Sequence, residues 1–250
     1  MAASVPLLSD NAVLSHGSAA VVHGLPIWRR GLSQVNVTRD RSGGGRRRPT
    51  VHVHVAPLER GEVVQVNGYA ATSLARTVVD LARTSGLDQG VAIADGALAL
   101  GVPATQLQAA LGRARGWPGV PLARSAIDLA DGRSESVGES VSRVRFLTHG
   151  LPKAVPQWVV SDGAGVVVGR CDFAWPELRT LGEFDGRAKY GRLRRPGESV
   201  ESAVYREKLR EDALRDLGWQ VVRWTWAELD NFAVVADRLW RAFARGRVQS

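Results

Sequence analysis

The spacing of hydrophobic and polar positions divides the chain into a mostly helical first part and a second part that mixes helices and strands. Residues 72–131 carry apolar side chains every three or four positions, as at Leu74 and Val78, and this predicts a series of short helices. Before them, residues 51–55 alternate apolar and polar side chains as a strand does, and the Val-rich residues 63–66 are predicted to form a second short strand. The pattern therefore predicts short strands followed by a helical region.

The second part, residues 134–250, gives one order of elements: a helix, three strands, a long helix, a fourth strand and a final helix. The predicted ranges are 136–148 for the first helix, 156–161, 166–174 and 180–185 for the three strands, 201–217 for the long helix, 219–226 for the fourth strand and 230–245 for the last helix. A crossover helix before the fourth strand favours a mixed sheet. We therefore predict an α/β (α+β) protein with a mixed four-stranded sheet flanked by helices in its C-terminal domain.

Turn residues and charge runs place the boundaries between regions. Asp131-Gly132-Arg133 separates the two halves, and we expect three regions: 1–70, 71–131 and 134–250. The first would be a partial winged helix within a mainly helical N-terminal half. Its basic loop, residues 39–48, is either a wing that reaches phosphates or a solvated surface loop.

Composition narrows the class of protein. The formal net charge is +8 and 44% of the residues are hydrophobic, so the chain can form real cores and favours a polyanionic partner such as nucleic acid. Cys171 is the only cysteine, which excludes an internal disulfide and a cysteine-rich zinc site. Neither a membrane span nor a signal peptide is predicted, so we expect a cytoplasmic protein without a membrane partner.

Three carboxylates mark the ends of two neighbouring predicted strands. Asp172 lies in the second strand, Glu183 and Asp185 lie on one side of the third, and Lys189 follows shortly after. A hairpin that places Asp172 beside Glu183 would gather hard oxygen ligands, which suit Mg²⁺ and phosphodiester chemistry. The sequence therefore predicts a metal site at this end of the sheet.

This order of elements, with Arg-Cys-Asp-Phe-Ala-Trp at 170–175 and Gly-Glu-Phe-Asp-Gly at 182–186, resembles the PD-(D/E)XK nuclease superfamily, and in particular its very-short-patch-repair-endonuclease-like branch. The resemblance covers about residues 134–226. It implies that Asp172, Glu183 and a glutamate on the preceding helix, Glu139, bind Mg²⁺, with Mn²⁺ as an alternative.

The resemblance also implies the remaining catalytic roles. Asp185 stands where the superfamily usually has lysine, so Lys189 is the candidate that offsets charge in the transition state, with Lys208 as a second. An Asp185 carboxylate is also a candidate for the metal shell. Four arginines after the third strand are candidate contacts to the nucleic-acid backbone: Arg187, Arg192, Arg194 and Arg195.

Several candidate residues also have a purely structural interpretation. Glu139 follows Ser136 by three positions, the spacing of a capping box, and Asp185-Gly186 is a common turn dipeptide. His52 and His54 point to one face of a strand, but without a third ligand nearby they are interpreted as strand-surface residues.

The first half resembles AbiEi-type antitoxin proteins of actinobacteria over about residues 10–130. The matching segments are Leu-Ser-His-Gly-Ser-Ala-Ala at 14–20, His-Gly-Leu-Pro at 23–26 and Thr-Ser-Leu-Ala-Arg-Thr-Val-Val-Asp at 72–80. That likeness implies DNA binding and a cognate toxin as a candidate partner.

Together these features predict a Mg²⁺-dependent endonuclease that hydrolyses phosphodiester bonds in DNA, with RNA as an alternative substrate. The alternative function is a non-catalytic DNA-binding regulator or antitoxin with a degenerate nuclease fold. The aspartate at position 185 in place of lysine favours that alternative, and the retention of Glu139, Asp172 and Glu183 favours the enzyme.

Overall fold

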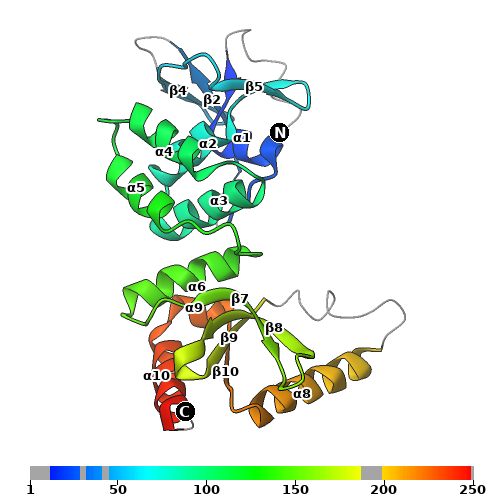
Figure 1. Cartoon of the computed structure of the whole chain (residues 1–250). Coiled ribbons are helices and arrows are strands. Elements are labelled where there is room, and N and C mark those ends of the chain that lie inside the picture. The colour runs from blue at the N-terminus through cyan, green and yellow to red at the C-terminus, as the bar shows by residue number, and fades with distance from the viewer. Residues whose placement is uncertain (1–11, 29–31, 41–44, 187–198, 249–250) are drawn as a thin grey trace. The chain divides into compact units, whose positions relative to one another are not determined.

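The computed structural model describes residues 12–28, 32–40, 45–186 and 199–248. The chain divides into two compact units, Met1–Gly132 (unit 1) and Arg133–Ser250 (unit 2), shown in Figure 1. The regions predicted for residues 1–70 and 71–131 both belong to unit 1. Each unit has its own sheet and helices.

Unit 1 contains a mixed sheet with the strand order β3-β4-β2-β1-β6-β5 among its described residues. β1 pairs antiparallel with β2 and parallel with β6, and β2 pairs parallel with β4. The sequence predicted β4 and β5, whereas the other strands were not predicted, so unit 1 has more strand than a partial winged helix suggests. The strands are β1 (Val13–Leu14), β2 (Val35–Arg39), β3 (Arg46–Arg47), β4 (Val51–Val55), β5 (Val63–Val66) and β6 (Tyr69–Thr72).

The helical periodicity of residues 72–131 is confirmed by four helices, and one more helix, α1, lies between β1 and β2 in the chain. Within α2, Arg76 Nε lies 3.0 Å from Asp80 Oδ2, the (i, i+4) pair that the spacing predicts. Glu62 joins this buried pair at 2.7 Å from Arg76 Nη1. The helices are α1 (His16–His23), α2 (Leu74–Ala82), α3 (Leu87–Ala99), α4 (Ala104–Arg113) and α5 (Val120–Asp128).

Unit 2 has the predicted order of elements and the predicted mixed four-stranded sheet. Its strand order is β10-β9-β8-β7; β7, β8 and β9 are antiparallel, and β10 runs parallel to β9 after the α8 crossover. The elements are α6 (Val137–Thr148), β7 (Val155–Ser161), β8 (Val167–Trp175), the short 3₁₀ helix η2 (Pro176–Leu178), β9 (Thr180–Asp185), α8 (Val200–Asp216), β10 (Gln220–Thr225), α9 (Trp226–Asp230) and α10 (Ala233–Val248). In the described parts of both units, every helix is too short or too polar to cross a bilayer.

Helices cover both faces of the unit 2 sheet, with α6 and α8 on opposite sides (Figure 1). On the α6 face, the Trp224 indole donates to Ser142 Oγ at 2.8 Å, and Phe184 packs directly against Gly138. On the α8 face, Leu214 packs in a cluster with Cys171 and Leu181. Neighbouring residues of β9 therefore face different helices, and this separation decides where the predicted site residues lie.

Candidate functional site

Glu139 lies in the first turn of α6 and is buried. Its backbone N–H donates to Ser136 Oγ at 3.2 Å, and the Ser136 hydroxyl donates to Glu139 Oε1 at 2.7 Å. Its other oxygen, Oε2, accepts from the Glu135 backbone N–H at 2.9 Å and from Gln157 Nε2 at 2.8 Å. Glu139 therefore stabilises the start of the helix, as the Ser136 spacing suggested, and is also held by a side chain from the sheet.

Asp172 lies in β8 close enough to affect Glu139. Burial raises the pKa of Glu139, and the negative charge of Asp172 raises it further, because a second carboxylate nearby disfavours ionisation. Asp172 Oδ2 accepts a hydrogen bond from the Phe184 backbone N–H at 2.7 Å. This bond fixes the carboxylate between β8 and β9, where the predicted acid of the second strand was expected.

Glu183 faces away from this pair, toward α8. Its Oε1 lies 2.6 Å from Arg210 Nη2 and its Oε2 lies 2.8 Å from Arg223 Nε, so each oxygen accepts from a guanidinium. Burial alone would raise the pKa of the neighbouring Glu207, but hydrogen bonding and the charge of Arg210 lower it. Glu183 is thus part of an ion-pair network on the α8 face.

The structure brings Glu139 and Asp172 together but does not bring Glu183 to them. No group of three or more His, Cys, Asp or Glu side chains is placed to hold a metal ion within the described ranges. The reason is the alternation of β9: Phe184 packs on Gly138 of α6, so its neighbour Glu183 points to the opposite face. The predicted cluster of three carboxylates is therefore corrected to a pair.

The other predicted residues divide between described and undescribed positions. Asp185 is the last residue of β9, pairs with Thr225 in the ladder and is half-buried. Lys208 lies exposed on α8. The predicted catalytic lysine and the four predicted DNA-contacting arginines lie outside the described residues: Arg187, Lys189, Arg192, Arg194 and Arg195.

Sequence reasoning did not identify three residues that the geometry places around these acids: Gln157, Arg210 and Arg223. Arg223 had a signal, because it alternates with apolar residues on a predicted strand and pairs directly with Glu183 in the parallel ladder. Arg210 and Gln157 lack a local pattern that distinguishes them from surface residues. Their roles come from contacts across 27 and 18 residues of sequence.

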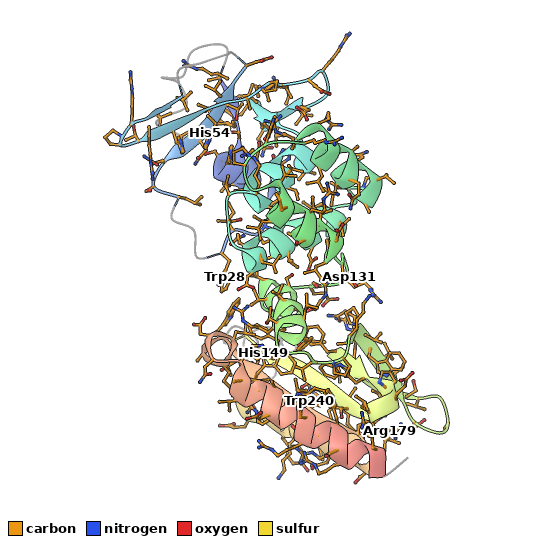
Figure 2. All side chains as sticks on the ribbon, turned by 90° about the vertical axis from the view of Figure 1, so that its left-hand side faces the viewer. Trp28, His54, Asp131, His149, Arg179 and Trp240 are labelled. Carbon is orange, nitrogen blue, oxygen red and sulfur yellow. The ribbon has the colours of Figure 1, made fainter. Side chains whose placement is uncertain are left out.

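A cluster of histidines lies in unit 1, where Figure 2 labels His54. The ring of His54 stacks on His16 with centroids 3.7 Å apart and lies 3.9 Å from the ring of His52, so the structure adds a third histidine to the predicted pair. Burial, together with the neighbouring His16 and His52, lowers the pKa of His54 to about 3. Stacked rings hold their nitrogens in nearly parallel planes, and His54 Nε2 lies 3.0 Å from Asn36 Oδ1. These contacts pack the sheet against α1 and do not form a metal site.

Comparison with known proteins gives relatives but no named activity. No protein-family model matches the chain, and no solved structure matches it. Two curated proteins of Mycobacterium tuberculosis are similar: uncharacterized protein MT2308 (strain CDC 1551 / Oshkosh) and uncharacterized protein Rv2248 (strain ATCC 25618 / H37Rv). Each is 30% identical over 228 residues, which cover 89% of this chain and 77% of the relative. The chain therefore belongs to the same family as these two mycobacterial proteins.

Proposed function

We propose that unit 2 is a Mg²⁺-dependent phosphodiesterase that cleaves DNA, with Glu139 and Asp172 as its metal-binding pair. The observation that carries this proposal is the approach of two carboxylates from different elements, the buried Glu139 of α6 and the half-buried Asp172 of β8. Gln157 of β7 connects them, because its Nε2 donates to Glu139 and it lies opposite Asp172 in the strand ladder. Two carboxylates that lie close together repel each other when both are ionised, and a divalent cation bound between them would offset that repulsion.

The residues present fit a magnesium ion. Mg²⁺ usually retains several waters and is bound through one or two carboxylates together with substrate phosphates, so a pair of acids is sufficient. Carboxylates are the hard oxygen ligands that this ion prefers. Mn²⁺ accepts the same ligands and is the practical probe.

In the proposed reaction a water attacks the phosphorus and the bond to the leaving oxygen breaks. A bound divalent cation supplies Lewis-acid polarisation of the phosphate and lowers the pKa of water. Asp172, whose Oδ2 is fixed by the Phe184 N–H, would hold the ion together with Glu139, which Ser136 orients. The net charge of +8 favours a polyanionic substrate. Lys189 remains the candidate that offsets charge in the transition state.

Cleavage of supercoiled plasmid with Mg²⁺ or Mn²⁺ tests this proposal. Asp172→Asn and Glu139→Gln should each abolish metal-dependent nicking while the protein remains folded. The matched control is Glu177→Gln, which removes an exposed carboxylate from η2. Nicking that survives in Asp172→Asn, or that is lost equally in the control, would contradict the assignment.

The second candidate is a non-catalytic DNA-binding regulator, with a toxin as its possible protein partner. The observation that favours it is that Glu183 is engaged by two arginines, which leaves two acids where the resemblance implies three. Salt-sensitive DNA binding without metal-dependent cleavage would select this candidate. A genomic neighbour encoding a toxin would then be the partner to test.

A further inference from the structure

Gln157 has a strained backbone in the middle of a strand. Its φ is +54°, in the left-handed region, although it lies inside β7. Asn67 and Arg179 also have positive φ, but each lies in a turn between two strands, where such a conformation is expected. A left-handed conformation is strained for a residue with a side chain, and it persists only where the surroundings impose it.

The contacts of Gln157 show what imposes the strain. Its Nε2 donates to Glu139 Oε2 at 2.8 Å, which joins β7 to the N-terminus of α6. In the ladder, Pro156 pairs with Phe173 and Trp158 pairs with Cys171, so Gln157 lies opposite Asp172. Gln157 therefore lies against both acids of the candidate site, one through a hydrogen bond and the other through strand register.

The partner strand is irregular at the same point. Cys171 and Phe173 are two residues apart and would share a face in a regular strand. Instead, Cys171 Sγ lies 3.8 Å from Arg210 on the α8 face, and Phe173 packs on Phe146 of α6 with ring centroids 5.0 Å apart. Asp172 is the residue at which β8 changes face. The distortions of β7 and β8 thus coincide at Gln157 and Asp172.

We propose that Gln157 is a positioning residue that holds Glu139 against Asp172 so that the two carboxylates bind one divalent cation. This inference rests on the proposed function and adds a side chain that touches the metal-binding pair without being one of the acids. Ser136 and Glu135 orient Glu139 from its own helix, whereas Gln157 is the contact that fixes the helix acid relative to the sheet. The strained backbone is the conformation that directs the amide toward Glu139.

The test is Mn²⁺ binding to the full-length protein, followed by electron paramagnetic resonance, in which the free-ion signal falls as the ion binds. The informative variant is Gln157→Asn, because asparagine tolerates the left-handed conformation but is one methylene too short to reach Glu139. Loss of such a supporting contact typically weakens metal binding about 10- to 100-fold. We expect this loss of Mn²⁺ affinity in a protein that remains folded.

Gln157→Gly and Gln65→Asn complete the design. Gln157→Gly also removes the contact and should bind Mn²⁺ as weakly as Gln157→Asn, because glycine keeps the positive φ of the strand but has no side chain to reach Glu139. Gln65→Asn makes the same replacement on β5 of unit 1 and should bind as the wild type does.

The outcomes separate the inference from the proposed function. Wild-type protein that binds Mn²⁺, with Asp172→Asn removing the binding and Gln157→Asn leaving it unchanged, would overturn the role of Gln157 alone. Wild-type protein without saturable Mn²⁺ binding would overturn the metal site, and the role of Gln157 would fall with it.

Discussion

Gly138→Ala should destabilise unit 2, although Gly→Ala in a helix ordinarily stabilises. Gly138 lies in the first turn of α6, directly before Glu139. A Cβ at this position would lie 1.9 Å from Phe184 Cε1 and 2.3 Å from Cζ, whereas carbon atoms pack at about 3.5–4.0 Å. The ring would have to move by roughly 1.5 Å to restore contact distance. Such a movement is opposed, because Trp226 packs edge-on against the same ring with centroids 5.0 Å apart.

The magnitude follows from two opposing contributions. Overpacking of a core typically costs about 1–3 kcal/mol, and the higher helix propensity of alanine returns up to ~1 kcal/mol. We therefore expect a net loss of roughly 1–2 kcal/mol in the free energy of unfolding of unit 2. Because the Phe184 N–H donates to Asp172, displacement of β9 should also weaken Mn²⁺ binding.

Urea denaturation followed by tryptophan fluorescence measures this effect, since six of the eight tryptophans belong to unit 2. The matched control is Gly112→Ala in α4 of unit 1, where an added Cβ meets nothing within 4 Å. The control should keep or raise stability, by up to ~1 kcal/mol. A Gly138→Ala protein as stable as the wild type, with the control behaving as expected, would refute the close packing of α6 on β9.

Three further predictions concern individual side chains. Glu183→Gln should lower the stability of unit 2 by roughly 1–3 kcal/mol, because the guanidiniums of Arg210 and Arg223 lose a charged partner. Mn²⁺ affinity should stay unchanged, and a folded variant that no longer binds Mn²⁺ would show that Glu183 belongs to the metal site. Cys171 is buried, and burial together with the charge of Glu183 raises the pKa of its thiol to about 12. Iodoacetamide should therefore label Cys171 at pH 8 only after the protein is unfolded in urea, and rapid labelling of the folded protein would contradict its burial. Burial would raise the pKa of Glu62, but hydrogen bonding from Arg113 and the charge of Arg76 outweigh it, so the pKa is lowered. The ionised Glu62 therefore stabilises unit 1 above the ordinary pKa of about 4.3, and this stabilisation is lost as the pH falls through the lowered pKa. Glu62→Gln should therefore flatten the acid side of the stability profile measured by circular dichroism, and an unchanged slope would refute this.

Local patterns were sufficient for most elements of unit 2. Each helix and strand predicted in unit 2 was found within a few residues of its predicted range, because alternation, helical periodicity and the Ser136 cap are properties of neighbouring residues. The mixed sheet followed from the same order, because a strand reached through a helix tends to run parallel to its neighbour. In unit 1, β1, β3 and β6 were missed. β1 and β3 are two residues long, too short for alternation to show, and β1 pairs with strands that are distant in the sequence. β6 pairs with β5 across Asn67-Gly68, a hairpin signal that was not used. β2 alternates Val-Asn-Val-Thr and carried a signal that was not used.

The residues of the candidate site also fall into those that the sequence selected and those whose roles only the tertiary structure revealed. The sequence pattern selected Asp172 as an acid within a predicted strand, and the resemblance to the nuclease superfamily added Glu139 on the preceding helix. Only the tertiary structure decided that Glu183 points away from them. Its direction depends on which face of β9 Phe184 occupies, and that face is set by the fit of Phe184 against Gly138 in another element. Gln157 and Arg210 gained their roles from contacts 18 and 27 residues away. The strand pattern fixes alternation but not which face is which, and the packing of helices against the sheet makes that choice.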